Sequence, residues 1–161
     1  MLVVDTPAFI DSILPVKGRE DRNRLARRAI SAAEAKGIPL LMPRLGVVGT
    51  ISLVKRLTGK EVAVDLTVEY LESKVLQVSE DWILEDAKTI ARKIHPRAAD
   101  SYFIATAKKF KAILISSDKD MTSRVEDREV TRDRKMGIRA FYVLDEAQLN
   151  EYLNEIPGGA V

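Results

Sequence analysis

The stretch AADSYFIATAKKFKAILISSDKDM, residues 98–121, decides the fold. Its first half places Phe103 and Ala107 at helical spacing and predicts a helix over Arg97–Phe110. Its second half, Ala112–Ser116 (AILIS), is a short aliphatic run that ends in a polar loop, as buried strands do. A helix that leads directly into a buried strand is typical of α/β proteins.

The same alternation continues on both sides of this stretch. Further strands are predicted at Leu2–Asp5, Pro39–Met42, Val75–Val78 and Arg139–Val143. Further helices are predicted at Glu20–Lys36, Val47–Leu57, Val62–Ser73, Glu80–Ile94 and within Met121–Lys135. The pattern indicates a single α/β domain with a largely parallel sheet over residues 1–156, followed by a flexible tail at residues 157–161.

Composition excludes several classes of site. The 161 residues include no cysteine and one histidine, His95, so disulfides, thiolate zinc sites and imidazole-rich metal sites are ruled out. Any metal must therefore be held by carboxylates, which favours Mg or Mn over Zn. The net charge of +2 is too small to identify a nucleic-acid-binding protein by itself.

The N-terminal residues MLVVDTPAFID contain no basic segment and reach an aspartate at position 5, unlike a signal peptide. No apolar run approaches the roughly 18 residues of a membrane span. We therefore expect a cytoplasmic protein.

Three aspartates fall where a parallel sheet binds its ligands, beyond the carboxyl ends of the strands. Asp5 ends the first strand, Asp118 follows the fourth, and Asp100 opens the helix before the fourth strand. Two of them have a structural alternative, since Asp118 could be a helix N-cap and Asp100 a partner of the helix dipole, whereas a cap does not require an aspartate such as Asp5 at the end of a core strand. Together they are costly unless a cation neutralises them, which points to a metal site.

The segments LVVDTPAFIDSIL (residues 2–14) and AADSYFIATAKKFKAILISSDKDM (residues 98–121) resemble the PIN-domain nucleases, which include VapC-type toxins of bacteria and archaea. The resemblance implies a three-layer α/β/α sandwich around a parallel five-stranded sheet. It also implies a metal-dependent endoribonuclease that cuts single-stranded RNA, a homodimer, and an antitoxin protein as a possible partner. The apolar residues of Val62–Leu71 exceed what a lone surface helix needs, which makes this segment a candidate dimer contact.

By the same resemblance, Asp5, Asp100 and Asp118 take three places of the acidic quartet that binds Mg²⁺ or Mn²⁺ and carries catalysis. Asp120 stands where relatives often have a further acid. Thr6 and Ser116 take the places of auxiliary hydroxyl residues.

One quartet position departs from the family pattern. The second acid of the family, usually a glutamate, falls at Gly49 when PRLGVVGTISLVKR (residues 43–56) is aligned with that helix. No acid occurs between Lys36 and Lys60. The alternative is therefore a catalytically weakened or inactive PIN-like module that binds RNA or protein.

Basic residues give a substrate hypothesis. Arginines crowd the stretch from Arg19 to Arg28, and Arg44 follows the second strand. A solvated helix face is the simpler interpretation, whereas phosphate contacts by Arg19, Arg22 and Arg44 would suit a nuclease. Trp82 is expected to pack in the core or between helices rather than to stack on bases.

A phosphotransfer module with Asp5 as nucleophile is a third possibility. Phosphatases of the haloacid dehalogenase type require a second aspartate two residues after the first, where this chain has Pro7. A receiver domain requires an acidic pair near the end of the first strand, which LVVD lacks. Both observations favour the nuclease.

Overall fold

The computed structural model describes residues 1–127, 133–134 and 137–157. Its main sheet has five strands in the order β3-β2-β1-β4-β7, and every neighbouring pair is parallel. The strands are β1 (Leu2–Val4), β2 (Leu40–Pro43), β3 (Val75–Val78), β4 (Ile113–Ser116) and β7 (Ala140–Tyr142). The five predicted strands are thus confirmed, and so is the parallel five-stranded sheet. A separate antiparallel pair joins β5 (Glu126–Asp127) to β6 (Asp133–Arg134).

Eight helices are seen in the described residues. They are α1 (Thr6–Ile13), α2 (Glu20–Ala35), α3 (Arg44–Thr58), α4 (Glu61–Lys74), α5 (Glu80–Ile94), α6 (Ala98–Phe110), α7 (Lys119–Val125) and α8 (Glu146–Glu155). The sequence predicts six of them and misses α1 and α8. Both missed helices are N-capped by aspartates, Asp5 and Asp145. The predicted tail falls at residues 157–161, and its last four residues lie outside the described part.

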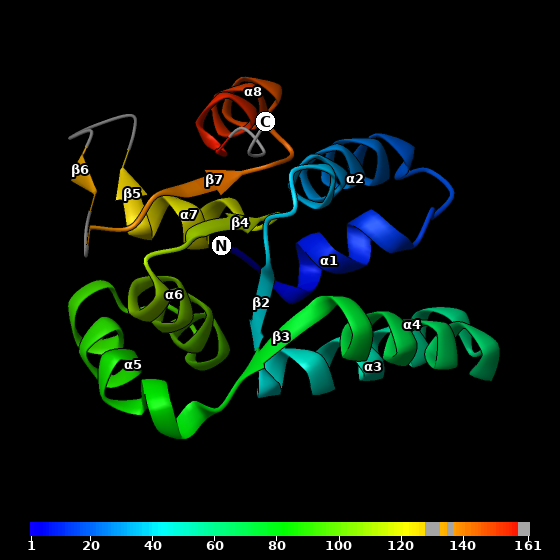
Figure 1. The fold of residues 1–161 in the computed structure, drawn as a ribbon, viewed down its shortest axis with the longest axis horizontal. Helices are drawn as coiled ribbons and strands as arrows, with labels where there is room; N and C mark the ends of the chain where they lie inside the picture. The colour runs from blue at the N-terminus through cyan, green and yellow to red at the C-terminus, as the bar shows by residue number, and fades with distance from the viewer. Residues whose placement is uncertain (128–132, 135–136, 158–161) are drawn as a thin grey trace.

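Helices cover both faces of the sheet, which makes the expected three layers. In Figure 1, α1, α2 and α8 lie on one side of the strands and α5, α6 and α7 on the other. The core consists of the fully buried strand residues, such as Val3 and Leu114, and the apolar stripes of the helices, such as Ile83 and Ile90 of α5. Helix α6 packs on β1, β2 and β4, so its first turn lies near the ends of the central strands.

The register of the central strands brings the two quoted segments together. Val4 of β1 is paired with Ile115 of β4, and the Asp5 amide donates to the Ile115 carbonyl at 3.3 Å. The residues that follow these strands, Asp5 and Ser116 to Asp118, therefore lie at one edge of the sheet. This edge is the carboxyl end, where α/β proteins bind ligands.

Two local features fix helix α3 at this edge. A Cβ atom on Gly46 would lie 2.5 Å from Cζ of Phe103 in α6, so only glycine lets the two helices approach this closely. The N-cap of α3 is Pro43, which has no side-chain acceptor, and Oε1 of Glu80 instead accepts the Leu45 amide at 2.7 Å. Glu80 thereby supplies the missing cap from the start of α5.

Trp82 is not in the core. Its side chain is 67% exposed on the first turn of α5, so the expectation that it packs inside is wrong. The buried stripe of α5 consists of Ile83, Ala87, Ile90 and Ile94, and Trp82 lies just beside this stripe in sequence. No helix in the described residues is long and apolar enough to cross a membrane.

Candidate active site

Asp5 is buried at the centre of the sheet's carboxyl edge, with 2% of its surface exposed. It is the N-cap of α1, and its Oδ1 accepts the Ala8 amide at 2.9 Å. Its Oδ2 accepts the hydroxyl of Ser116. Both carboxylate oxygens therefore have a donor, although a capping aspartate does not need to be buried in this way.

Ser116 connects two of the candidate acids. Its hydroxyl donates to Asp5 and accepts the Asp118 amide at 2.8 Å. Because Ser116 is fully buried, this bridge fixes the end of β1 against the loop after β4. The auxiliary position nominated from the sequence thus lies between Asp5 and Asp118.

Asp118 is the N-cap of α7, which confirms the structural role considered for it from the sequence. Its Oδ1 accepts the amides of Asp120 at 2.9 Å and Met121 at 3.3 Å. Asp100 lies in the first turn of α6 and is half-buried. Within the described residues, the Asp100 carboxylate has no hydrogen bond or ion pair.

The environment of Asp5 and Asp100 favours their protonated forms. Burial, with smaller contributions from the negative charges of Asp100 and Asp118, raises the pKa of Asp5 to about 7, although the hydrogen bonds from Ser116 and Ala8 oppose the shift. Burial also raises the pKa of Asp100, with a contribution from Asp118 that Arg97 partly offsets. Hydrogen bonds at a helix N-cap lower the pKa of a carboxyl group, so the capping role of Asp5 does not explain its raised pKa.

Gly49 borders the same site. A Cβ atom on Gly49 would lie 3.7 Å from the Thr6 hydroxyl oxygen, and nothing else comes within 4 Å. Thr6 directly follows Asp5, and its hydroxyl donates to the Gly46 carbonyl at 3.3 Å. The position aligned with the second acid of the family therefore lies beside Thr6, the neighbour of Asp5, and has room for a longer side chain.

The further acid, Asp120, is charge-paired. Its Oδ2 accepts Nε of Arg124 at 2.8 Å, and Nη1 of Arg124 donates to the Ile94 carbonyl at 3.1 Å. Arg124 thus ties α7 to the end of α5. Asp120 is exposed and already neutralised, which makes it a weaker metal ligand than the other three aspartates.

The three arginines nominated for substrate binding differ in their contacts. Arg22 forms two hydrogen bonds to the buried Asp11, at 3.0 and 3.3 Å, and Arg19 lies 4.0 Å from the same carboxylate. Arg44 is exposed at the start of α3 and makes no ion pair within the described residues. Of the three, only Arg44 therefore has a free guanidinium near the carboxyl edge.

The aspartates suit a hard divalent cation in donor type. Carboxylate oxygens are preferred by Mg²⁺ and Mn²⁺, and a bound cation would offset both the burial and the repulsion that raise the pKa values of Asp5 and Asp100. In the part of the chain that the structure describes, no three His, Cys, Asp or Glu side chains are gathered tightly enough to hold a metal ion. In this arrangement Asp5, Asp100 and Asp118 do not converge on one point, so they match a divalent cation in donor type and charge and not as a formed set of ligands.

Sequence reasoning missed two residues that shape the site. Glu80 caps α3 although it lies 35 residues from Leu45 in the sequence, and no local sequence pattern predicts such a contact. Arg97 lies close enough to Asp100 to lower its pKa, and its place three residues before Asp100 on a predicted helix could have indicated this.

Comparison with known protein families matches residues 2–127 to the PIN domain. A search among curated proteins found no match. PIN domains are a nuclease-type family whose members generally bind nucleic acid and use divalent metal ions. The matched residues hold four of the five strands and all three candidate aspartates. Because the match covers most of the sequence, the chain belongs to the PIN domain family.

Proposed function

We propose that this protein is a metal-dependent endoribonuclease that cuts single-stranded RNA, and that Asp5, Asp100 and Asp118 form its active site. The observation that carries the proposal is the state of Asp5. A carboxylate with 2% exposure and a pKa raised to about 7 destabilises the folded protein at neutral pH. Folding does not need a buried carboxylate at this position, whereas a cation site at a strand end does.

Asp5, Asp100 and Asp118 would hold Mg²⁺ or Mn²⁺. When bound, the ion supplies Lewis-acid polarisation of the phosphate and a water of lowered pKa. Ser116 keeps Asp5 and Asp118 in a fixed relative position, and the hydrogen bond from Ser116 favours the ionised form of Asp5. The half-buried Asp100 has a carboxylate without a partner in the described part of the chain, so it can rotate toward a ligand.

The test is cleavage of a labelled single-stranded RNA with Mg²⁺ or Mn²⁺. Asp118→Asn keeps an oxygen for the N-cap of α7 but removes the charge, so activity should fall by roughly 100-fold or more. Asp21→Asn is the matched control, because Asp21 is exposed on α2 and paired with Arg24, and it should cleave like the wild type. Equal activity in wild type and Asp118→Asn would refute the metal mechanism.

Because Gly49 provides no acid, the alternative is a PIN-like module without catalytic activity, and the same test distinguishes it from a nuclease. If the wild type cleaves no RNA with either metal but still binds it, the chain is a PIN-like binding module.

A role as the toxin of a toxin–antitoxin pair extends the proposal. It rests on the resemblance of the two quoted segments to VapC-type toxins. Expression of the wild-type chain in a bacterial host should then stop growth, whereas Asp118→Asn at equal protein level should not. Unimpaired growth with active wild-type protein would refute the toxin role.

We also expect a homodimer in which α4 contributes to the interface. Val62 and Leu66 are 70% and 61% exposed on this helix, which is more apolar surface than a solvated helix needs. Light scattering should give twice the chain mass of 18.0 kDa for the wild type and the single chain mass for Leu66→Glu. A monomeric wild type at high concentration would contradict this expectation.

A further inference from the structure

A strongly basic surface lies beside Asp100, where α5 ends and α6 begins. It consists of Arg92 and Lys93 in the last turn of α5 and Arg97 at the N-cap of α6, and we call these three residues the basic corner. All three side chains are exposed. Within the described residues, none of them makes an ion pair or a side-chain hydrogen bond.

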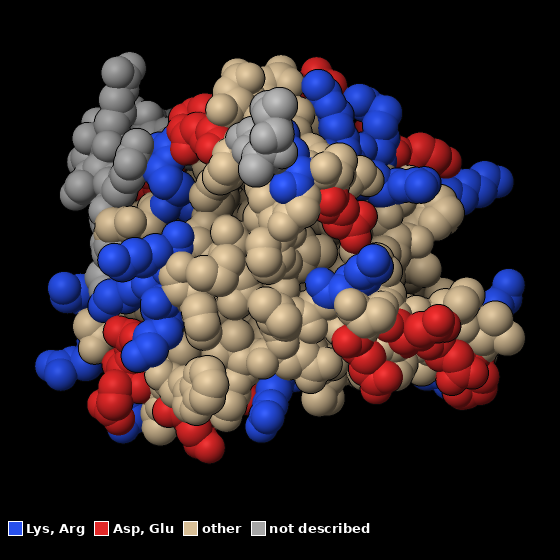
Figure 2. All heavy atoms as spheres, in the orientation of Figure 1, with Lys and Arg blue, Asp and Glu red and all other residues tan. Residues whose placement is uncertain are grey.

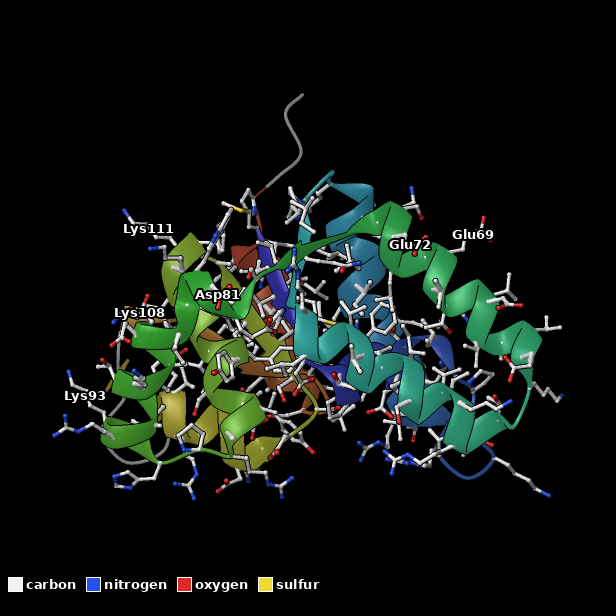
Figure 3. The ribbon with its side chains drawn as sticks, turned by 90° about the horizontal axis from the view of Figure 1, so that it is seen from below. Glu69, Glu72, Asp81, Lys93, Lys108 and Lys111 are labelled. Atoms are coloured by element: carbon white, nitrogen blue, oxygen red, sulfur yellow. The ribbon has the colours of Figure 1, made fainter. Side chains whose placement is uncertain are left out.

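The side of the molecule formed by α5 and α6 carries both signs of charge. In Figure 2, blue side chains gather over this side with red ones below them, and Figure 3 shows Lys93, Lys108 and Lys111 directed away from the ribbon. Lys108 forms an ion pair with Asp86 at 3.2 Å, so its positive charge is compensated, unlike the charges of the basic corner. Acidic Glu69 and Glu72 lie on α4, on the opposite side of the same view.

The corner is held in a fixed conformation. His95 has φ of 53°, which is rare for a residue other than glycine, and its ring nitrogen lies 2.9 Å from the Arg92 carbonyl oxygen. Pro96 follows and restricts the backbone further. Two helices therefore meet at a short turn that places the three cations together before any ligand arrives.

The corner is also tied to the candidate site. Arg97 is three residues from Asp100 in the same helical turn, a spacing at which side chains are neighbours. Arg124 joins the Ile94 carbonyl at the end of α5 to Asp120 in α7, the helix that Asp118 caps. The backbone that carries the three cations is thus continuous with the helix of Asp100 and tied to the helix that Asp118 caps.

We propose that Arg92, Lys93 and Arg97 bind backbone phosphates of the single-stranded RNA and hold the strand beside Asp100. This inference rests on the proposed ribonuclease function. Three acids repel a polyanion, so a nuclease needs nearby cations that are not already neutralised. The basic corner meets this need, and it adjoins Asp100 without belonging to the acidic cluster.

The arginines of α2 are the competing surface. Arg19 and Arg22 contact Asp11, and Arg24 contacts Asp21 and Glu146, so most of this charge is compensated. Helix α2 also lies on the other side of the sheet from α5 and α6 (Figure 1). Arg27 and Arg28 remain exposed there, which allows a control matched in charge.

The test measures binding without cleavage. The probe is a fluorescein-labelled, single-stranded 2′-O-methyl RNA of about 12 nucleotides, titrated with protein in EDTA and followed by anisotropy over a salt series. The variant is Arg92→Ala/Lys93→Ala/Arg97→Ala. Three lost phosphate contacts should lower the slope of log K against log salt by about 2, because each contributes about 0.7 on a single strand. Affinity at low salt should fall roughly tenfold or more.

The control is Lys17→Ala/Arg27→Ala/Arg28→Ala, which removes the same charge from exposed positions around α2. It should keep the wild-type slope, and thermal unfolding should show both variants folded. An equal loss in both variants, or a wild-type slope in the corner variant, would overturn the proposal.

Cleavage assays separate the two proposals. If the wild type binds through the corner but cuts no RNA with Mg²⁺ or Mn²⁺, the proposed function fails and the phosphate site stands. If the corner variant binds and cuts like the wild type while Asp118→Asn does not cut, the function stands and the phosphate site fails.

Discussion

At the scale of single residues, the places of the three aspartates relative to the strands can be predicted from sequence, whereas their hydrogen-bond partners cannot. Asp5, Asp100 and Asp118 follow from the positions of aspartates relative to strand ends, because a parallel sheet gathers those ends at one edge. The bridge through Ser116 links residues 111 positions apart in the chain, and it depends on the pairing of β1 with β4. The pairing of Arg19 and Arg22 with Asp11 is equally invisible to a local pattern.

Asp5→Asn should stabilise the metal-free protein at pH 8. The pKa of Asp5 rises from 3.8 unfolded to about 7 folded, so the folded state binds the extra proton between these values. The free energy of unfolding therefore decreases as pH rises from about 4 to about 7, and it then stays level. Asparagine lacks this titration, so unfolding by urea in EDTA should show a gain of up to about 4 kcal/mol at pH 8.

The same variant should lose the decline in stability between pH 4 and 7 that is expected of the wild type. Asp120→Asn serves as the control, because Asp120 is exposed. Parallel stability curves for wild type and Asp5→Asn would mean that Asp5 titrates normally.

Gly49→Glu should tighten metal binding. The position faces Thr6 with open space beyond, and an added carboxylate supplies one more hard oxygen ligand. Calorimetric titration with Mn²⁺ and Mg²⁺ should give a lower Kd for the variant, and RNA cleavage should increase. An unchanged Kd would show that Gly49 does not stand at the position of the quartet acid that this chain lacks.

At the scale of elements, the buried strands were the easiest to predict, since each is a short apolar run between polar residues. β3 was predicted at Val75–Val78, its observed position, although Leu76 and Gln77 are exposed at the edge of the sheet. Helices α1 and α8 were missed for different reasons. Thr6–Ile13 directly follows a strand and has Pro7 in its first turn, and α8 is largely polar, with only Leu149 and Tyr152 buried.

Two glycines of α3 should respond to alanine in opposite directions. Gly46→Ala places a methyl group 2.5 Å from Phe103 and 2.7 Å from Met42, and such overpacking costs about 1–3 kcal/mol. Gly49→Ala meets only Thr6, at an ordinary 3.7 Å, and should gain about 0.5–1 kcal/mol from helix propensity. Chemical denaturation of both variants measures the difference, and two changes of the same sign would contradict the packing described for Gly46.

At the scale of the whole molecule, the segment beyond the family match completes the sheet. β7 pairs with β4, and Tyr152 of α8 donates to the Ala29 carbonyl of α2 at 2.9 Å. Arg139 contacts Glu126, the first residue of β5 and the C-cap of α7, which is 6% exposed. It also contacts Glu151 and Glu155 on α8. The last strand and helix are therefore part of the folded core.

Arg139→Ala should destabilise the protein by about 3–5 kcal/mol, because it leaves the carboxylate of Glu126 buried without its guanidinium partner. Adding Glu126→Gln removes the buried charge and should recover part of the loss, as thermal unfolding can measure. A double variant no more stable than Arg139→Ala would place the loss in packing over Phe141, whose ring lies 5.0 Å from the guanidinium.

The central place of β1 in the sheet has a consequence for the growing chain. The strand made first pairs with β4, so Asp5 waits for Ser116 and Asp118 to leave the ribosome. At about 5–20 residues per second, the chain needs roughly 6–23 s to extend from Asp5 to Asp118. Until then the three aspartates cannot come together, so under the proposed function a nascent chain would hold no cutting site near the message that encodes it.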